Sequence, residues 1–158
     1  MIIQLRTDGL ELARRVHGPE HPAFVQALHD YALSLYDAGQ YTESLEALQR
    51  EKELIKQGSG IANMQQEAES HLAIGNCLLA MQEPAQALSQ YEMSRAILQQ
   101  IHPHPHQHPD FIAVLMNSGL AMQQCNRHQE ALSLYSRALR QAEDVLGKCA
   151  VDIIMSYC

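Results

Sequence analysis

Apolar and small residues recur along this chain at the three- and four-residue spacing of an amphipathic helix. Three segments show the same pattern and align without internal gaps: 27–45, 70–88 and 114–132. Successive segments are offset by 43 and 44 residues. The dipeptides His21-Pro22 and His108-Pro109 lie 87 residues apart, which is the sum of those two offsets. Two independent landmarks therefore indicate an internal repeat of about 43 residues.

Each repeat reads as two helices joined by a short polar turn. The first helix carries a small residue and the second a bulky one, at matching positions: Ala32 with Leu48, Gly75 with Tyr91, and Gly119 with Tyr135. Small residues let two helix axes approach, and bulky residues fill the groove beside them. Pro84 suits the first position of a second helix, and Gly39 can take the positive φ that ends a first helix. Such a helix pair cannot bury its own apolar face, so it must stack on a neighbour.

The pattern of small, apolar, glycine, aromatic, small and bulky positions resembles the tetratricopeptide repeat. It is best preserved in the first unit, at Ala32, Leu35, Gly39, Tyr41, Ser44 and Leu48. The longer period and the linker 16–23 are similar to the repeats of kinesin light chains, in which Gly-x-x-His-Pro-Asp precedes each unit. His108-Pro109-Asp110 and the segment 146–152 are similar to that linker. The resemblance covers residues 10–158 and implies an all-α, right-handed superhelical solenoid of antiparallel helix pairs.

The whole chain, 1–158, is predicted to be one repeat domain. Its expected parts are a closing helix of a preceding unit (8–20), three repeats (21–60, 61–104 and 105–148) and the start of a truncated fourth unit (149–158). Helical arrays normally end in polar capping helices, but both ends here carry apolar residues, such as Leu10 and Val151–Met155. We therefore expect an excerpt of a longer array, or a protein that associates with itself through its open ends.

Composition and charge exclude several classes of protein. Helix-favouring Ala, Leu, Gln, Glu and Met make up nearly half of the chain, which argues against β and parallel-sheet folds. The net charge is −7, and no basic face is visible, so a nucleic-acid partner is not expected. No signal peptide and no apolar stretch of about 20 residues is present, so we expect a cytoplasmic protein without a membrane partner. The four cysteines form no Cys-x-x-Cys pair and are expected to be reduced thiols.

Catalytic and cofactor motifs are missing from the sequence. It has no Gly-rich phosphate loop, no Gly-x-Ser-x-Gly and no His-Glu-x-x-His, so neither an enzyme nor a cofactor is expected. The run His102–His108 holds four imidazoles, which could bind zinc, copper or nickel. Three of them precede a proline, and histidines two apart on an extended proline-rich backbone point about 120° apart. A stiff linker is therefore the favoured interpretation, and a metal-binding protein stays as an alternative.

In a tetratricopeptide superhelix the first helices line a concave groove, and the resemblance places one stripe of each first helix there. The candidate groove residues are His29, Leu33, Tyr36, Leu72, Asn76, Leu79, Met116, Asn117, Leu120 and Gln123. Asn76 and Asn117 are the strongest candidates, because an amide inside a helix needs a partner and a peptide backbone supplies donors and acceptors. The stripe has no Lys or Arg, which disfavours a C-terminal carboxylate as ligand. His71 falls where other units carry leucine, and we expect it to pack between helices.

The sequence therefore predicts a scaffold that binds a peptide or helical segment of a protein partner in a concave groove. An apolar or amphipathic segment suits its leucines, methionine and amides. Only Asn117 matches the Leu-Asn-Asn-Leu-Ala stretch typical of kinesin light chains, which argues against acidic cargo peptides. A sensor or regulatory array of a larger signalling ATPase remains an alternative.

Overall fold

The chain forms α-helices throughout the part that a computed structural model describes, which is residues 2–19, 21–57, 61–102 and 108–146. These residues hold no strand. The helices are α1 (Ile2–His17), α2 (Pro22–Asp37), α3 (Tyr41–Gln57), α4 (Ile61–Ala80), α5 (Pro84–Ile101), α6 (Pro109–Gln124) and α7 (His128–Leu146).

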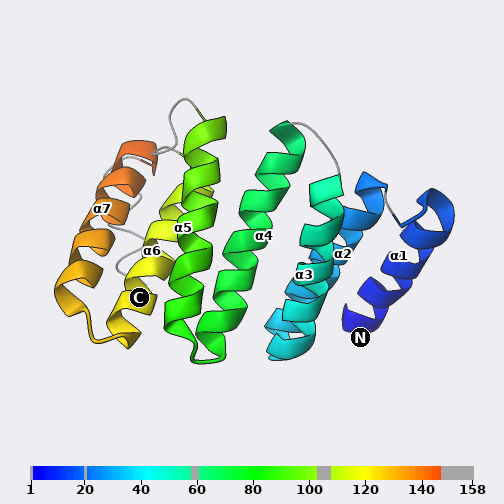
Figure 1. Cartoon of the computed structure of the whole chain (residues 1–158), viewed down its shortest axis with the longest axis horizontal. Helices are drawn as coiled ribbons and strands as arrows, with labels where there is room; N and C mark the ends of the chain where they lie inside the picture. Colours follow the sequence, from blue (N-terminus) through cyan, green and yellow to red (C-terminus); the bar gives the residue numbers. More distant parts are fainter. Residues whose placement is uncertain (1, 20, 58–60, 103–107, 147–158) are drawn as a thin grey trace.

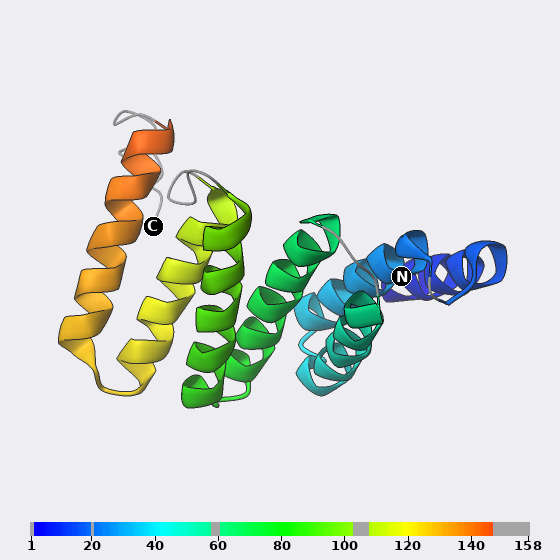
Figure 2. The same ribbon diagram turned by 45° about the horizontal axis from the view of Figure 1, so that its top comes forward.

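The helices stand side by side in chain order along the longest axis of the molecule (Figures 1 and 2). Each packs mainly on its neighbours in sequence, and the alternate helices α2, α4 and α6 also touch in order. Contacts between neighbouring units alone are what distinguish a solenoid from a closed bundle. The predicted all-α repeat solenoid is thus confirmed. Helix α1 begins at Ile2, six residues before the expected range 8–20, and the predicted fourth unit lies outside the described residues.

Histidine caps explain the His-Pro pairs that begin α2 and α6. The Nδ1 atom of His21 accepts the backbone N–H of Ala23 at 3.1 Å, and that of His108 accepts the N–H of Asp110 at 3.3 Å. Each imidazole thereby satisfies one free N–H at the start of α2 or α6, and the following proline occupies the first helical turn. Each capping ring also stacks on a histidine from the end of the preceding helix, at 4.6 Å on His17 and 4.1 Å on His102.

The turn inside each repeat uses one residue with positive φ. Gly39, Gln82 and Asn126 occupy the same repeat position and have φ of 78°, 64° and 61°. In each turn this residue and the next donate backbone hydrogen bonds to carbonyls of the last helical turn, as from Gln82 to Leu79 and from Glu83 to Leu78. This is the paired hydrogen bonding that commonly closes a helix with a left-handed residue. The positive φ expected at Gly39 is confirmed, and the turn forms even where glycine is absent.

The small-to-bulky pairs predicted from the repeat hold the helix pairs together. A Cβ built on Gly75 would lie 2.7 Å from Cδ1 of Tyr91, and one on Gly119 would lie 2.5 Å from Cε1 of Tyr135. Both rings therefore press against helix backbone that only glycine leaves bare. In the first repeat the smaller Leu48 takes the place of tyrosine, and alanine is tolerated opposite it at position 32.

Candidate functional site

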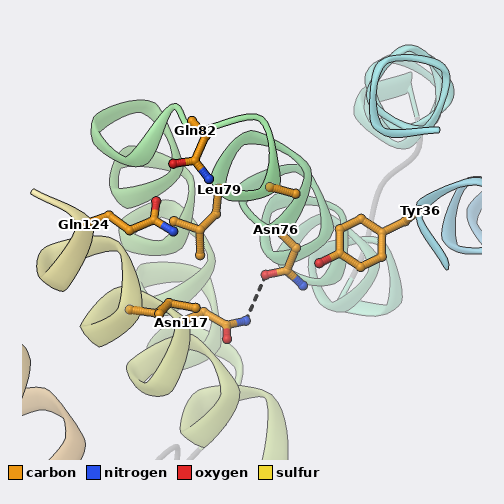
Figure 3. A pocket seen from close by; sticks show the side chains of 8 residues that line it. Tyr36, Asn76, Leu79, Gln82, Asn117 and Gln124 are labelled. Atoms are coloured by element: carbon orange, nitrogen blue, oxygen red, sulfur yellow. Dashed lines mark hydrogen bonds between the residues drawn. The ribbon is translucent and has the colours of Figure 1, made fainter. Parts of the chain in front are cut away.

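A pocket of about 260 Å³ opens where α2, α4 and α6 come together (Figure 3). It is lined by Tyr36, Asn76, Leu79, Ala80, Gln82, Asn117, Leu120 and Gln124. All eight come from the three alternate helices or from the turn after α4. Its wall has four amides, one phenol and no charged side chain. The pocket brings together Tyr36, Asn76, Leu79, Asn117 and Leu120 of the residues predicted for the groove.

The two asparagines are bonded to each other. Nδ2 of Asn117 donates to Oδ1 of Asn76 at 2.8 Å (Figure 3), and the hydroxyl of buried Tyr91 donates to the same oxygen at 2.9 Å. Nδ2 of Asn76 and Oδ1 of Asn117 make no hydrogen bond to any residue that the structure describes. The pair therefore offers one fixed donor and one fixed acceptor at the pocket wall.

Tyr36 and two leucines supply the rest of the pocket surface. The ring of Tyr36 lies beside Asn76 (Figure 3), and burial followed by the neighbouring Tyr41 raises the pKa of its hydroxyl. The hydroxyl therefore stays neutral at physiological pH, so it can both donate and accept. Leu79 is nearly buried, but Leu120 is 42% exposed. An exposed leucine in a concave wall is a contact point for an apolar group.

Three of the predicted groove residues already have partners inside the fold. Nδ1 of His29 contacts both carboxylate oxygens of Glu51, at 3.0 and 3.1 Å. Leu72 packs against the core, and Gln123 accepts a hydrogen bond from the hydroxyl of Tyr135 at 3.2 Å. These side chains stabilise the walls of the solenoid. Leu33 and Met116 do not line the pocket, but they are 40% and 46% exposed.

The His29–Glu51 pair is a buried interaction between α2 and α3. The side chain of Glu51 is 2% exposed and that of His29 is 12% exposed. Burial lowers the pKa of His29, but the hydrogen bond and charge of Glu51, with smaller contributions from Glu69 and Asp30, raise the pKa above 6.5 overall. The pair therefore favours a charged imidazole beside a buried carboxylate.

Three pocket residues were not predicted, namely Ala80, Gln82 and Gln124. Gln124 lies seven residues after Asn117, so the same helical stripe extended by two turns reaches it. Gln82 lies in the turn after α4, where it has a positive φ. No helical spacing could have found it, because it lies outside a helix.

Histidine and cysteine side chains elsewhere have structural roles. His71 is buried, and its Nδ1 contacts Oε1 of Gln90 at 2.7 Å, which agrees with the predicted packing position. Burial lowers the pKa of His71 despite this hydrogen bond. Cys77 and Cys125 are free thiols. In the ranges that the structure describes, no three His, Cys, Asp or Glu side chains are placed to hold a metal ion, and His104 and His106 lie outside those ranges.

The two end helices expose apolar side chains. Leu5, Leu12 and Val16 of α1 are more than 60% exposed, and Leu132 of α7 is 56% exposed. Leu132 corresponds to Leu45 and Leu88, which pack against the core in the first two repeats. Self-association through these faces stays a prediction. None of the described helices is long and apolar enough to cross a membrane.

Comparison with known proteins supports the fold. BtubC (BKLC) from P. vanneervenii superposes with a TM-score of 0.76 at 15% sequence identity, over 92% of this chain and 57% of that chain. Kinesin light chain TPR-like repeats from Podosopora anserina match with a TM-score of 0.43 at 15% identity, over 91% of this chain and 86% of theirs. No family model and no curated protein matches the sequence. The BtubC similarity shows that the chain has a tetratricopeptide-like fold.

Proposed function

We propose that this tetratricopeptide-like solenoid is a protein-interaction scaffold that binds an extended segment of a partner protein in the pocket between α2, α4 and α6. Its proposed task is binding rather than catalysis, and we expect it to need no cofactor. The observation that carries the proposal is the Asn76–Asn117 pair, which leaves one amide donor and one amide acceptor unused within the described residues.

An extended peptide backbone has the groups that this pair can bind. Each peptide unit offers one carbonyl and one N–H, which match Nδ2 of Asn76 and Oδ1 of Asn117. The bond between the two asparagines and the bond from Tyr91 hold Asn76 in place before a ligand arrives. Binding therefore loses little side-chain entropy at this point. Exposed Leu120 and Met116 then supply apolar contacts for the side chains of the segment.

Gln82 adds an independent argument for a binding role of the pocket. A glutamine with φ of 64° is strained by about 1 kcal/mol relative to glycine, which stands at the same place in the first repeat. Residues with strained backbone conformations occur most often at functional sites. The side chain of Gln82 lines the pocket, and binding there gives a reason for keeping it.

We expect the double variant Asn76→Ala and Asn117→Ala to lose peptide binding. Loss of two hydrogen bonds to the peptide backbone should raise the dissociation constant about tenfold or more. The measurement starts with a random peptide library displayed on phage, and fluorescence anisotropy then gives the affinity of a selected peptide for each variant. Gln49→Ala with Gln99→Ala, two exposed amides on the outer helices α3 and α5, is the matched control. Equal affinity for the parent and the asparagine variant would refute the pocket as the binding site.

We expect Gln82→Gly to separate stability from binding. Glycine relieves the left-handed strain, so the free energy of unfolding should rise by about 1 kcal/mol. The same change removes an amide from the pocket and should weaken the selected peptide several-fold. Chemical denaturation followed by circular dichroism measures the first effect, and anisotropy measures the second. A variant that is both more stable and an equally good binder would show that strain at position 82 is unrelated to binding.

The cytoplasm fits this proposal as the place of action. Cys77 and Cys125 are free thiols, as expected in a reducing compartment.

A further inference from the structure

The lysines and arginines of this chain avoid the helices that form the pocket. None of the eleven lies in α2, α4 or α6, whereas these three helices carry Asp30, Asp37, Glu67, Glu69 and Asp110. The basic residues are in α1, α3, α5 and α7, with Arg127 in a turn and Lys148 outside the described residues. Apart from the imidazole of His29, which pairs with Glu51, the charged side chains of α2, α4 and α6 are therefore acidic.

Two of these carboxylates are placed beside each other. Nε2 of Gln65 donates to Oε1 of Glu69 at 2.7 Å and to Oδ2 of Asp110 at 3.1 Å, so one neutral amide joins α4 to α6 here. Neither carboxylate pairs with a lysine or arginine among the described residues. The ring of His108 approaches the Asp110 carboxylate at 3.5 Å, and its Nδ1 also accepts the Asp110 backbone N–H.

The other three carboxylates do not share the helical stripes of the asparagine pair. Asp30 bonds with Arg6 at 3.0 Å and with Gln26 at 3.2 Å. Glu67 approaches His71 at 3.9 Å. Asp37 is exposed and directly follows Tyr36 at the end of α2. Glu69 and Asp110 are therefore the carboxylates that lie on the same stripes of α4 and α6 as the asparagine pair.

The carboxylate pair and the asparagine pair form two parallel rungs across α4 and α6. Glu69 precedes Asn76 by seven residues, and Asp110 precedes Asn117 by seven. Seven residues are two helical turns, so each carboxylate lies on the same stripe as its asparagine, about 10 Å away. An extended peptide advances about 3.3 Å per residue, so three residues span the distance between the rungs.

From this geometry we infer that the pocket selects a cationic segment, in which an arginine or lysine lies about three residues from the apolar residue held beside the asparagine pair. The inference rests on the proposed function and adds the chemistry of the partner. The cation binds between Glu69 and Asp110, where it can replace the amide of Gln65 as the shared donor. Arginine suits this position best, because its planar fork can donate to two carboxylates at once.

The test uses a fluorescein-labelled peptide that contains Leu-Ala-Ala-Arg, together with the reversed order Arg-Ala-Ala-Leu. The matched peptides carry citrulline, which is neutral but nearly isosteric, in place of arginine. We expect the arginine peptide in one of the two orders to bind about fivefold more tightly than its citrulline counterpart, as two partly exposed ion pairs would give. This difference should shrink as salt is added.

The double variant Glu69→Gln and Asp110→Asn should make the arginine and citrulline peptides bind alike. His108 caps α6 through its imidazole, so Asp110→Asn leaves the cap in place, and thermal melting followed by circular dichroism checks the fold. Glu46→Gln with Glu53→Gln removes the same charge from exposed positions of α3 and should keep the preference.

Equal binding of arginine and citrulline peptides by the parent chain would overturn the inference. So would an equal loss of preference in the α3 variant, because that would show an effect of net charge alone. Either result would leave the proposed function standing if a phage-selected peptide still requires Asn76 and Asn117. Failure of the asparagine test would instead remove the proposed function itself.

Discussion

Replacing His29 with leucine is expected to destabilise the solenoid by about 3 kcal/mol. The change leaves the carboxylate of Glu51 buried between α2 and α3 without its partner, and breaking a buried pair from one side is costly. Leucine itself should fit, because Leu72 holds the corresponding place in the second repeat. The free energy of unfolding, from chemical denaturation followed by circular dichroism, measures the loss.

The second repeat indicates a compensating substitution for this variant. In the second repeat Leu72 is accompanied by Ser94 where Glu51 stands in the first, and Oγ of Ser94 donates to the carbonyl of Ala68 at 2.7 Å. His29→Leu with Glu51→Ser copies that arrangement and should recover most of the lost stability. A single variant as stable as the parent would contradict the role given to the buried pair.

The cost of His29→Leu should also depend on pH. The folded-state pKa of His29 is raised above 6.5, so its contribution to stability is fully present below pH 6.5 and declines as pH rises through the raised value. The stability difference between the parent and His29→Leu should therefore narrow on going from pH 6 toward pH 8, as denaturation at several pH values would show. A difference that widens over that range would mean that the imidazole is not the charged partner.

Gly75→Ala is expected to destabilise the pair α4–α5 by about 2 kcal/mol. The added Cβ would overlap the ring of Tyr91, which is fully buried. Overpacking of this kind costs about 1–3 kcal/mol, which outweighs the helix propensity that alanine gains over glycine. Because Tyr91 also bonds to Asn76, a displaced ring should weaken peptide binding at the same time. Thermal and chemical denaturation measure the stability, and anisotropy measures the binding.

Two further variants isolate the contact with Tyr91. Gly9→Ala places the same methyl group on α1, where nothing lies within 4 Å of the new Cβ, and it should stabilise the helix by up to about 1 kcal/mol. Gly75→Ala with Tyr91→Leu copies the Ala32–Leu48 pair of the first repeat and should be more stable than Gly75→Ala alone. If Gly9→Ala and Gly75→Ala change stability equally, the ring contact is not the cause.

Much of the fold could be predicted because it depends on local and periodic features. The 43-residue period, the helix pairs, the turn at Gly39 and the glycine–tyrosine packing all follow from spacing and from residue size. The caps at His21 and His108 were visible as a recurring His-Pro pair, but their function was not predicted. Histidine is an uncommon N-cap, so only the observed hydrogen bonds explain the recurrence.

The candidate site was predictable only in part. The helical stripe led to Tyr36, Asn76 and Asn117, because residues seven apart share one face of a helix. The same stripe included His29, whose partner Glu51 lies on another helix, 22 residues further along the chain. The stripe could not include Gln82, which reaches the pocket from a turn.

The sequence by itself determined that the chain repeats, where its helices pair and which stripe of each first helix lacks lysine and arginine. These properties depend on residues within one or two helical turns of each other, and spacing along the chain records them. Only the tertiary structure decided which side chains meet across helices, such as Asn76 with Asn117, 41 residues apart. Such pairs depend on the rotation of each repeat relative to the preceding repeat and on the side-chain rotamers at the contact. Neither follows from the order of residues alone.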